Sequence, residues 1–324
     1  MSRLVYTKMN ADRDEGEAVE RRERKRFRLG RVEVEDTYAE AFRAAATRVI
    51  ITAETARWAR IAAVEATGYG TSVIGCDAEA GIERELTTAE TPDGRPGVSV
   101  LLFTFKKERL KEAVRNRVGQ CVLTCPTTAC YNGLPAESQE ETIEVGRYVS
   151  FFGDGFQTQR SAHGRTVWCV PVMDGEFVCE ERVGVVQAVA GGNLLLCGRD
   201  RASTLKAAET AVKAIEPLPE VVTPFPGGIV RSGSKVGSQS YSNLKATTND
   251  AFCPTLRTRT RSLLPQGVEA VYEIVVNGLN EQAVRRALQA ALHAVADCSG
   301  LVLVTAGNYN GRLGRIHFHL RELV

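Results

Sequence analysis

Apolar and polar residues follow one another along the chain in a repeating order of strand, helix and strand. Period-two alternation predicts a strand, and apolar residues three and four positions apart predict one buried stripe on a helix. In the first half we predict strands at 48–53, 71–76, 98–105 and 120–125, a helix at 54–68, and a second helix with Leu110, Val114 and Val118 on its stripe.

The second half repeats this order. It predicts strands at 193–198, 221–230 and 270–278, a further strand opening the segment 301–311, a helix at 203–216 striped by Leu205, Ala208, Val212 and Ile215, and a helix capped by Asn280 with Val284, Leu288, Leu292 and Val295 in register. The segments AEAGIE and FPGGIV close corresponding units, which indicates an internal duplication.

Two βαβ units in one domain most simply form a four-stranded antiparallel sheet with both helices on one face. The predicted fold class is therefore α+β, with two ferredoxin-like lobes. We expect a charged N-terminal tail at 1–31, an N-terminal lobe at 32–150, a β-rich connection at 151–180 and a C-terminal lobe at 181–324. The sheet faces without helices require cover from another lobe or subunit.

Composition narrows the function classes. The formal net charge is +2, so the overall field gives no argument for binding nucleic acid or a membrane. No apolar run approaches the roughly 20 residues that cross a bilayer, and the amino terminus is not a secretory signal. Nine cysteines without a CxxC pair indicate reduced thiols. We expect a soluble cytoplasmic protein.

A single carboxylate, Glu273, interrupts the apolar strand AVYEIVVNG and shares one face with Val271 and Val275. A buried acid is either paired with a cation or holds its proton near neutral pH, and a neutral acid can donate to an oxygen that gains charge. Alternatively, Glu273 lies near a strand end or an edge and reaches water or an arginine. The residues alone leave both interpretations open.

The segment 223–244 is rich in glycine and hydroxyl groups. It misses the GK[ST] ending of a phosphate-binding loop by one residue, so a nucleotide triphosphate site is disfavoured. Arg231, Ser232, Ser234 and Lys235 nevertheless offer donors to a ligand, while an ordinary surface turn is the alternative.

Two other sequence features are weaker evidence for a function. His317 and His319 flank Phe318 on one predicted strand, but no third metal ligand is evident, so we expect no metal site. A ferredoxin-like sheet is also an RNA-binding platform, yet the aromatic RNP pattern is absent and the charge is balanced.

The sequence resembles the formylmethanofuran:tetrahydromethanopterin formyltransferase family. The resemblance runs from VEVEDTYAEAF at 32–42 to the carboxyl end, through motifs that occur in one order. These are EATGYGTSVIGCDAEAGIE, ETPDGRPG, GQCVLTCPT, SFFGDGF, VAGGN, PFPGGIV, SKVGS, TNDAFCPT, VYEIVVNGLN and TAGNYNGRLG. Such a set is highly specific.

The resemblance implies reversible transfer of a formyl group from formylmethanofuran to the position-five nitrogen of tetrahydromethanopterin. Methanofuran and tetrahydromethanopterin are then substrates, and no metal or prosthetic group is implied. The catalytic glutamate of the family falls on Glu273, which favours the interpretation of a buried acid. We expect Arg231, Ser232, Ser234, Lys235, Asn249 and Arg95 to bind substrate.

The resemblance also implies a dimer of dimers of two-lobed subunits. The slight excess of cations suggests a low-salt bacterial member rather than a salt-adapted archaeal one, and bacterial relatives work as one subunit of a formyltransferase/hydrolase complex. Other subunits of such a complex are therefore candidate partners. A subunit that keeps the fold as a scaffold without catalysing transfer is the alternative function. The tail at 1–30 lies outside the resemblance.

Overall fold

The computed structural model describes residues 25–135 and 139–324. Most of the predicted charged tail, residues 1–24, lies outside the described residues. The longer helices are α2 (Ala56–Thr67), α3 (Lys107–Arg117), α4 (Gly146–Ser150), α5 (Arg201–Ile215) and α6 (Glu281–Ala294). None of the helices in the described ranges is long and apolar enough to span a membrane.

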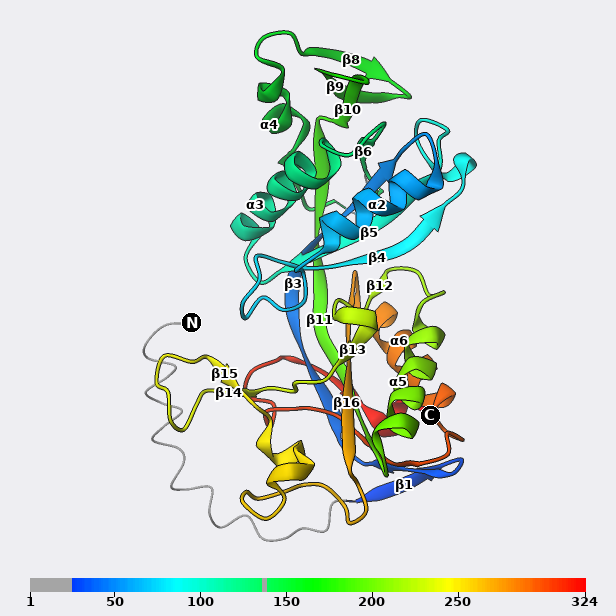
Figure 1. The fold of residues 1–324 in the computed structure, drawn as a ribbon, viewed down its shortest axis with the longest axis vertical. Coiled ribbons are helices and arrows are strands. Elements are labelled where there is room, and N and C mark those ends of the chain that lie inside the picture. The colour runs from blue at the N-terminus through cyan, green and yellow to red at the C-terminus, as the bar shows by residue number, and fades with distance from the viewer. Residues whose placement is uncertain (1–24, 136–138) are drawn as a thin grey trace.

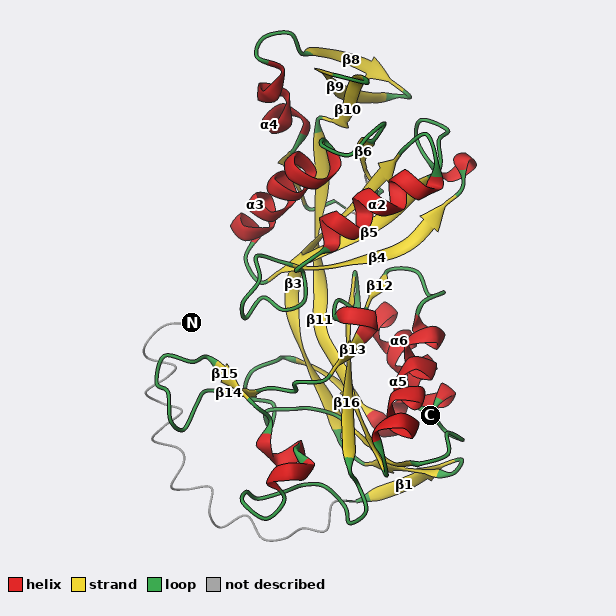
Figure 2. Ribbon diagram, viewed as in Figure 1, coloured by secondary structure: helices red, strands yellow, loops and turns green. Residues whose placement is uncertain are grey.

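Strands make up most of the remaining regular structure (Figure 2). They are β1 (Arg26–Leu29), β2 (Val32–Glu35), β3 (Tyr38–Thr52), β4 (Glu79–Leu86), β5 (Gly97–Thr104), β6 (Ala129–Asn132), β7 (Glu141–Glu144), β8 (Thr158–Ala162), β9 (Arg165–Val172), β10 (Gly175–Glu180), β11 (Arg182–Gly198), β12 (Val221–Val222), β13 (Ile229–Val230), β14 (Lys235–Val236), β15 (Ala246–Thr247), β16 (Ala270–Gly278), β17 (Leu301–Thr305) and β18 (Ile316–His319).

Two long strands, β3 and β11, run antiparallel through the length of the molecule (Figure 1). They contain 15 and 17 residues, or about 50 Å of extended chain each. Their central residues pair with each other, from Phe42 opposite Ala190 to Ala46 opposite Val186. Their outer parts join other strands, so one continuous backbone ladder links two groups of elements.

The N-terminal lobe consists of β3 to β6 with α2 and α3. In its sheet β3 pairs with β6 on one side and β5 on the other, and β4 pairs with β5; every pairing is antiparallel. Alanines of α2 and the stripe of α3 pack on the sheet residues Val49, Val100 and Leu102. The predicted stripe of Leu110, Val114 and Val118 is buried as expected.

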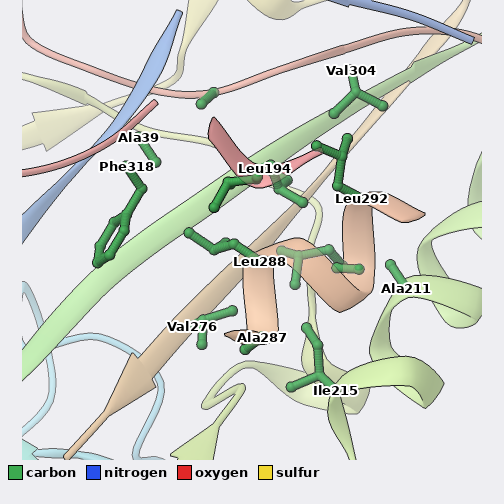
Figure 3. Packing of buried hydrophobic residues seen from close by; sticks show 14 of the residues in the cluster. Ala39, Leu194, Ala211, Ile215, Val276, Ala287, Leu288, Leu292, Val304 and Phe318 are labelled. Carbon is green, nitrogen blue, oxygen red and sulfur yellow. The ribbon is translucent and has the colours of Figure 1, made fainter. Parts of the chain in front are cut away.

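The C-terminal lobe consists of β11 to β18 with α5 and α6. Here β11 pairs antiparallel with β16 and β17, and the short strands β12 and β13 pair antiparallel with β16. Figure 3 shows the core between this sheet and its helices, where Leu194 and Val276 meet Leu288 of α6. Asn280 caps α6 as predicted, because its side chain accepts a hydrogen bond from the N–H of Ala283 at 2.8 Å.

Strands from the start of the chain lie in the C-terminal lobe, beside strands from its end. β2 lies parallel to β17, and β18 pairs with the first residues of β3. The segment 158–180 forms three antiparallel strands, of which β10 also pairs with β6. Residues 32–41 therefore belong to the sheet of the C-terminal lobe, and residues 158–180 extend that of the N-terminal lobe.

Two predicted strands are wrong. Residues 71–76 form turns in which Gly75 and Cys76 bond back to the Ser72 carbonyl, and the strand begins at Glu79. Residues 120–125 continue α3 through a π-helical turn, Val118–Val122, and the strand begins at Ala129. Both apolar runs are too short to distinguish a strand from other structure. In the second, Val118 and Val122 lie four positions apart on the apolar stripe of α3, so this run extends the helix.

One predicted core position is also wrong. Leu205 is 38% exposed, whereas Ala207, Ala208 and Ala211 are buried between α5 and α6. Small residues let two helices approach closely, so the contact stripe of α5 is rotated from the one that large apolar residues predict. Ala208, Val212 and Ile215 are buried as expected.

Candidate active site

Glu273 lies on the sheet face opposite α5 and α6. Along β16, Ile274 and Val276 are fully buried against the helices, while Val271 packs in a separate cluster on the other face. Alternation therefore places the Glu273 side chain on the face that it shares with Val271, as predicted, and this face points away from the helices. Its strand is not an edge at this point, because Leu195 of β11 and Val230 of β13 are its two cross-strand partners.

The Glu273 carboxyl has no hydrogen-bond or ion-pair partner among the described residues, and the side chain is half-buried. Burial raises its pKa from 4.5 to about 7. The strand is not an edge here and no described arginine pairs with Glu273, so those parts of the alternative are wrong, whereas the partly exposed side chain does reach solvent. The acid is thus partly protonated at neutral pH and has a free O–H to donate.

A glycine-rich segment surrounds β13, the short strand that pairs with β16 at Glu273. Gly227 and Gly228 have φ of 61° and 75°, left-handed values that favour glycine, and turn the chain into β13. Val230 pairs with Glu273, so Arg231 and Ser232 come directly after its neighbour. An open hollow of about 540 Å³ is lined by Phe225, Pro226, Ile229, Val230, Arg231 and Ser232.

The donors of this segment differ in availability. Arg231, Ser232 and Ser234 are exposed and have no side-chain partner among the described residues. Lys235 instead forms an ion pair with Asp250, and its strand β14 pairs with β15. Asn249 lies against Gly233, where an added Cβ would sit 3.3 Å from the Asn249 Cβ. The fold therefore brings the predicted residues of 231–249 together.

Arg95 is held at the other end of β3. Its guanidinium bonds to Asp93 at 2.9 Å, to the Thr127 carbonyl at 2.6 Å and to the Thr52 hydroxyl at 3.1 Å. Glu40, at the start of the strand, and Glu273 both lie close enough to act on the Tyr309 phenol, and the twelve residue steps from Glu40 to Thr52 span about 40 Å. Arg95 therefore lies far from Glu273 within one chain, and its expected role in substrate binding stays a prediction.

The structure adds the loop 306–314 to the site, although the sequence did not predict it there. Glu40 is buried and accepts four backbone N–H groups of this loop. The donors are Tyr309, Gly311, Leu313 and Gly314, at 2.6, 2.9, 2.7 and 2.5 Å. Burial alone would raise the pKa of Glu40, but these donors lower it below 4.5. The glycines and asparagines of TAGNYNG were the feature of the sequence that could have indicated this loop.

Tyr309 lies in this loop close to Glu273. Its half-buried phenol has a raised pKa, first because of burial and then because of the nearby charges of Glu273 and Glu40. The phenol has no hydrogen-bond partner among the described residues. Sequence reasoning missed this neighbour, because residues 309, 40 and 273 meet only when three distant segments fold together.

The histidine pair and the cysteines form no metal site in the described part of the chain. His317 and His319 both pack on the Tyr38 ring, with centroids 4.6 and 5.2 Å apart. All nine cysteines are free thiols, as predicted.

The fold is that of a two-domain α+β protein, and its site combines a half-buried carboxyl that has no partner among the described residues with exposed donors on the neighbouring segment. Residues 27–172 match the family model of formylmethanofuran-tetrahydromethanopterin formyltransferase, and residues 175–323 match the model of its proximal lobe. The chain belongs to this family of formyltransferases, as its sequence resemblance implies.

Relatives of similar length agree with this assignment. The chain is 51% identical to formylmethanofuran–tetrahydromethanopterin formyltransferase of Methanosarcina mazei over 90% of this chain and 98% of that protein. It is 52% identical to a subunit of the formyltransferase/hydrolase complex of Methylorubrum extorquens over 92% of this chain and 97% of that protein.

Two solved structures have the same fold. The formyltransferase of Methanosarcina barkeri has a TM-score of 0.86 at 50% identity, covering 90% of this chain and 98% of that one. The formyltransferase/hydrolase complex of Methylorubrum extorquens with methylofuran has a TM-score of 0.88 at 52% identity, covering 92% of this chain and 99% of that one.

Proposed function

We propose that this chain reversibly transfers a formyl group between formylmethanofuran and the position-five nitrogen of tetrahydromethanopterin. Relatives at about half identity over nearly their whole length carry both substrates in their names. The observation that supports the chemistry is Glu273, an unpaired acid whose pKa burial raises to about 7, beside exposed donors.

The proposed mechanism uses Glu273 as an acid. The pterin nitrogen attacks the formyl carbon, a C–N bond forms, and the carbonyl oxygen becomes anionic. The Glu273 O–H donates a hydrogen bond to this oxygen. The attacking pterin nitrogen loses its proton and the methanofuran nitrogen gains one, so that the bond to the methanofuran nitrogen breaks, the neutral amine leaves and the carbonyl re-forms. One donor of this kind contributes about 10²- to 10³-fold in kcat.

Binding is proposed at the free donors next to this acid. Arg231, Ser232 and Ser234 are exposed and unpaired in the described part of the chain, so they suit carboxylate or amide groups of a substrate. Lys235 and Asn249 contribute by holding the segment in place, since Lys235 is already paired with Asp250.

Variants of Glu273 test the mechanism in a transfer assay with both substrates. Glu273→Ala is expected to lower kcat by about 10²- to 10³-fold, because the donor is lost. Glu273→Gln keeps an N–H donor, so a smaller loss than in Glu273→Ala is expected if the hydrogen bond carries the effect. The exposed Glu269→Gln is the matched control. Normal kcat in Glu273→Ala would remove this residue from the mechanism.

A catalytically silent scaffold is the second candidate. It is supported by one relative that is named as part of a formyltransferase/hydrolase complex. We propose other subunits of such a complex as partners, beside self-association as a dimer of dimers, in the cytoplasm. Wild-type protein that lacks transfer activity alone but joins these subunits would favour the scaffold, and solution mass with and without partners measures both assemblies.

We further infer that each lobe is ferredoxin-like. The strand orders β6-β3-β5-β4 and β17-β11-β16-β13 support this, since both place the first and third strands of a βαββαβ unit at the centre. The lobe boundaries at 31, 150 and 180 remain predictions, because the two long strands belong to both sheets.

A further inference from the structure

The loop 306–314 crosses the sheet face that carries Glu273. Leu195 of β11 pairs with Glu273 on one side and with Thr305, the last residue of β17, on the other. Neighbouring strands are about 4.8 Å apart, so the chain leaves the sheet about 10 Å from the Glu273 backbone. The residues that follow Thr305 therefore begin within side-chain reach of the acid.

Asn193 holds the first part of this loop on that face. It is the cross-strand partner of Val275, whose side chain lies on the same side of β16 as Glu273. Its Oδ1 accepts from the Gly307 N–H at 2.6 Å, and its Nδ2 donates to the Gly307 carbonyl at 3.2 Å. This paired contact fixes the direction in which the loop turns after Thr305.

Glu40 fixes the second part. Its two carboxylate oxygens each accept two N–H groups from residues 309–314, and Asn310 and Gly311 take left-handed φ of 57° and 70°. A buried carboxylate with four charge-assisted hydrogen bonds holds its partners strongly. The backbone of Tyr309 is therefore positioned before any ligand arrives.

The Tyr309 phenol and the Glu273 carboxyl are close, unpaired within the described residues, and half-buried. Neither is fully enclosed, because neither appears among the described side-chain atoms that are buried without a partner. Both are O–H donors with no acceptor on the described part of the protein. Two such donors suit a ligand oxygen that accepts from both.

We propose that Tyr309 is a second catalytic residue, whose hydroxyl donates a hydrogen bond to the formyl oxygen together with Glu273. The proposal rests on the proposed formyl transfer. As the carbonyl oxygen becomes anionic, both hydrogen bonds shorten, and both relax when the carbonyl re-forms. The phenol keeps its proton throughout, so the atoms and charges of the transfer are unchanged.

The test compares Tyr309→Phe with Tyr272→Phe, a tyrosine that packs on the helix side of β16. Tyr309→Phe is expected to lower kcat by about 10- to 100-fold and to change KM for either substrate by less than about threefold. Tyr272→Phe is expected to retain kcat. The thermal unfolding midpoint of both variants checks that the fold is intact.

A double variant, Glu273→Ala with Tyr309→Phe, tests whether the two groups act on one atom. If they share the formyl oxygen, the double loss is smaller than the product of the single losses. Unchanged kcat in Tyr309→Phe, or a loss in KM alone, overturns the proposal while leaving the function intact. A wild-type protein without transfer activity overturns both.

Discussion

The raised pKa of Glu273 predicts a specific pH dependence of stability. Because the folded pKa of about 7 lies above the ordinary 4.5, the folded state favours the protonated acid. The stabilising contribution is fully present below pH 4.5 and is lost as pH rises through 7. Glu273→Gln resembles the protonated acid and does not titrate, so it should become more stable than wild type as the pH rises.

The size of the effect follows from the two pKa values. The difference between 4.5 and about 7 corresponds to about 3 kcal/mol once both states are ionised. Most of this develops between about pH 5 and pH 8, where the unfolding free energy of wild type should fall by about 2.5 kcal/mol relative to Glu273→Gln.

Urea unfolding of wild type and Glu273→Gln at pH 5, 6, 7 and 8 measures this difference, with the exposed Glu269→Gln as control. The control should run parallel to wild type. Transfer activity of wild type should also decline above about pH 7 as the acid ionises. If the two stability curves stay parallel within about 0.5 kcal/mol, Glu273 is ionised in the folded protein and the acid mechanism fails.

Two further predictions concern buried carboxylates. Glu40→Gln leaves N–H groups of the loop 306–314 without acceptors, so we expect a loss of about 2–4 kcal/mol at pH 7 by urea unfolding. Since the pKa of Glu40 is lowered, this difference should shrink as pH falls below 4.5. Arg48 pairs with the buried Glu83 at 2.6 Å, so Arg48→Met should cost about 3–5 kcal/mol, whereas Arg60→Met, from an exposed pair, should cost under about 1 kcal/mol. Equal costs for the two arginines would contradict the importance of burial.

The sequence predicts the fold where local periodicity and packing agree. Alternation places Glu273 on the correct face of β16, and Asn280 caps its helix as its position indicates. Prediction from the sequence fails where an apolar run is short or fits both a strand and a helix. Residues 120–125 resemble a strand but extend a helix, and the predicted strand 221–230 contains only two paired dipeptides, β12 and β13.

The site is less predictable than the fold because its neighbours are distant in sequence. Arg231 and Ser232 could be found, since they follow the partner strand of Glu273 directly. Tyr309 could not, because a carboxylate at position 40 fixes its loop. Arg95 was expected in the site, yet its hydrogen bonds place it at the far end of β3.

The pairing of β2 with β17 has a consequence for synthesis on the ribosome. Glu33 lies opposite Leu303, so 270 residues separate the paired positions. At about 5–20 residues per second, β2 waits roughly 15–50 s for its partner to be translated. One of the first strands of the sheet is therefore completed only when almost the whole chain has been made. During that interval its open edge can form wrong pairings, so nascent chains should need a chaperone more than the finished enzyme does.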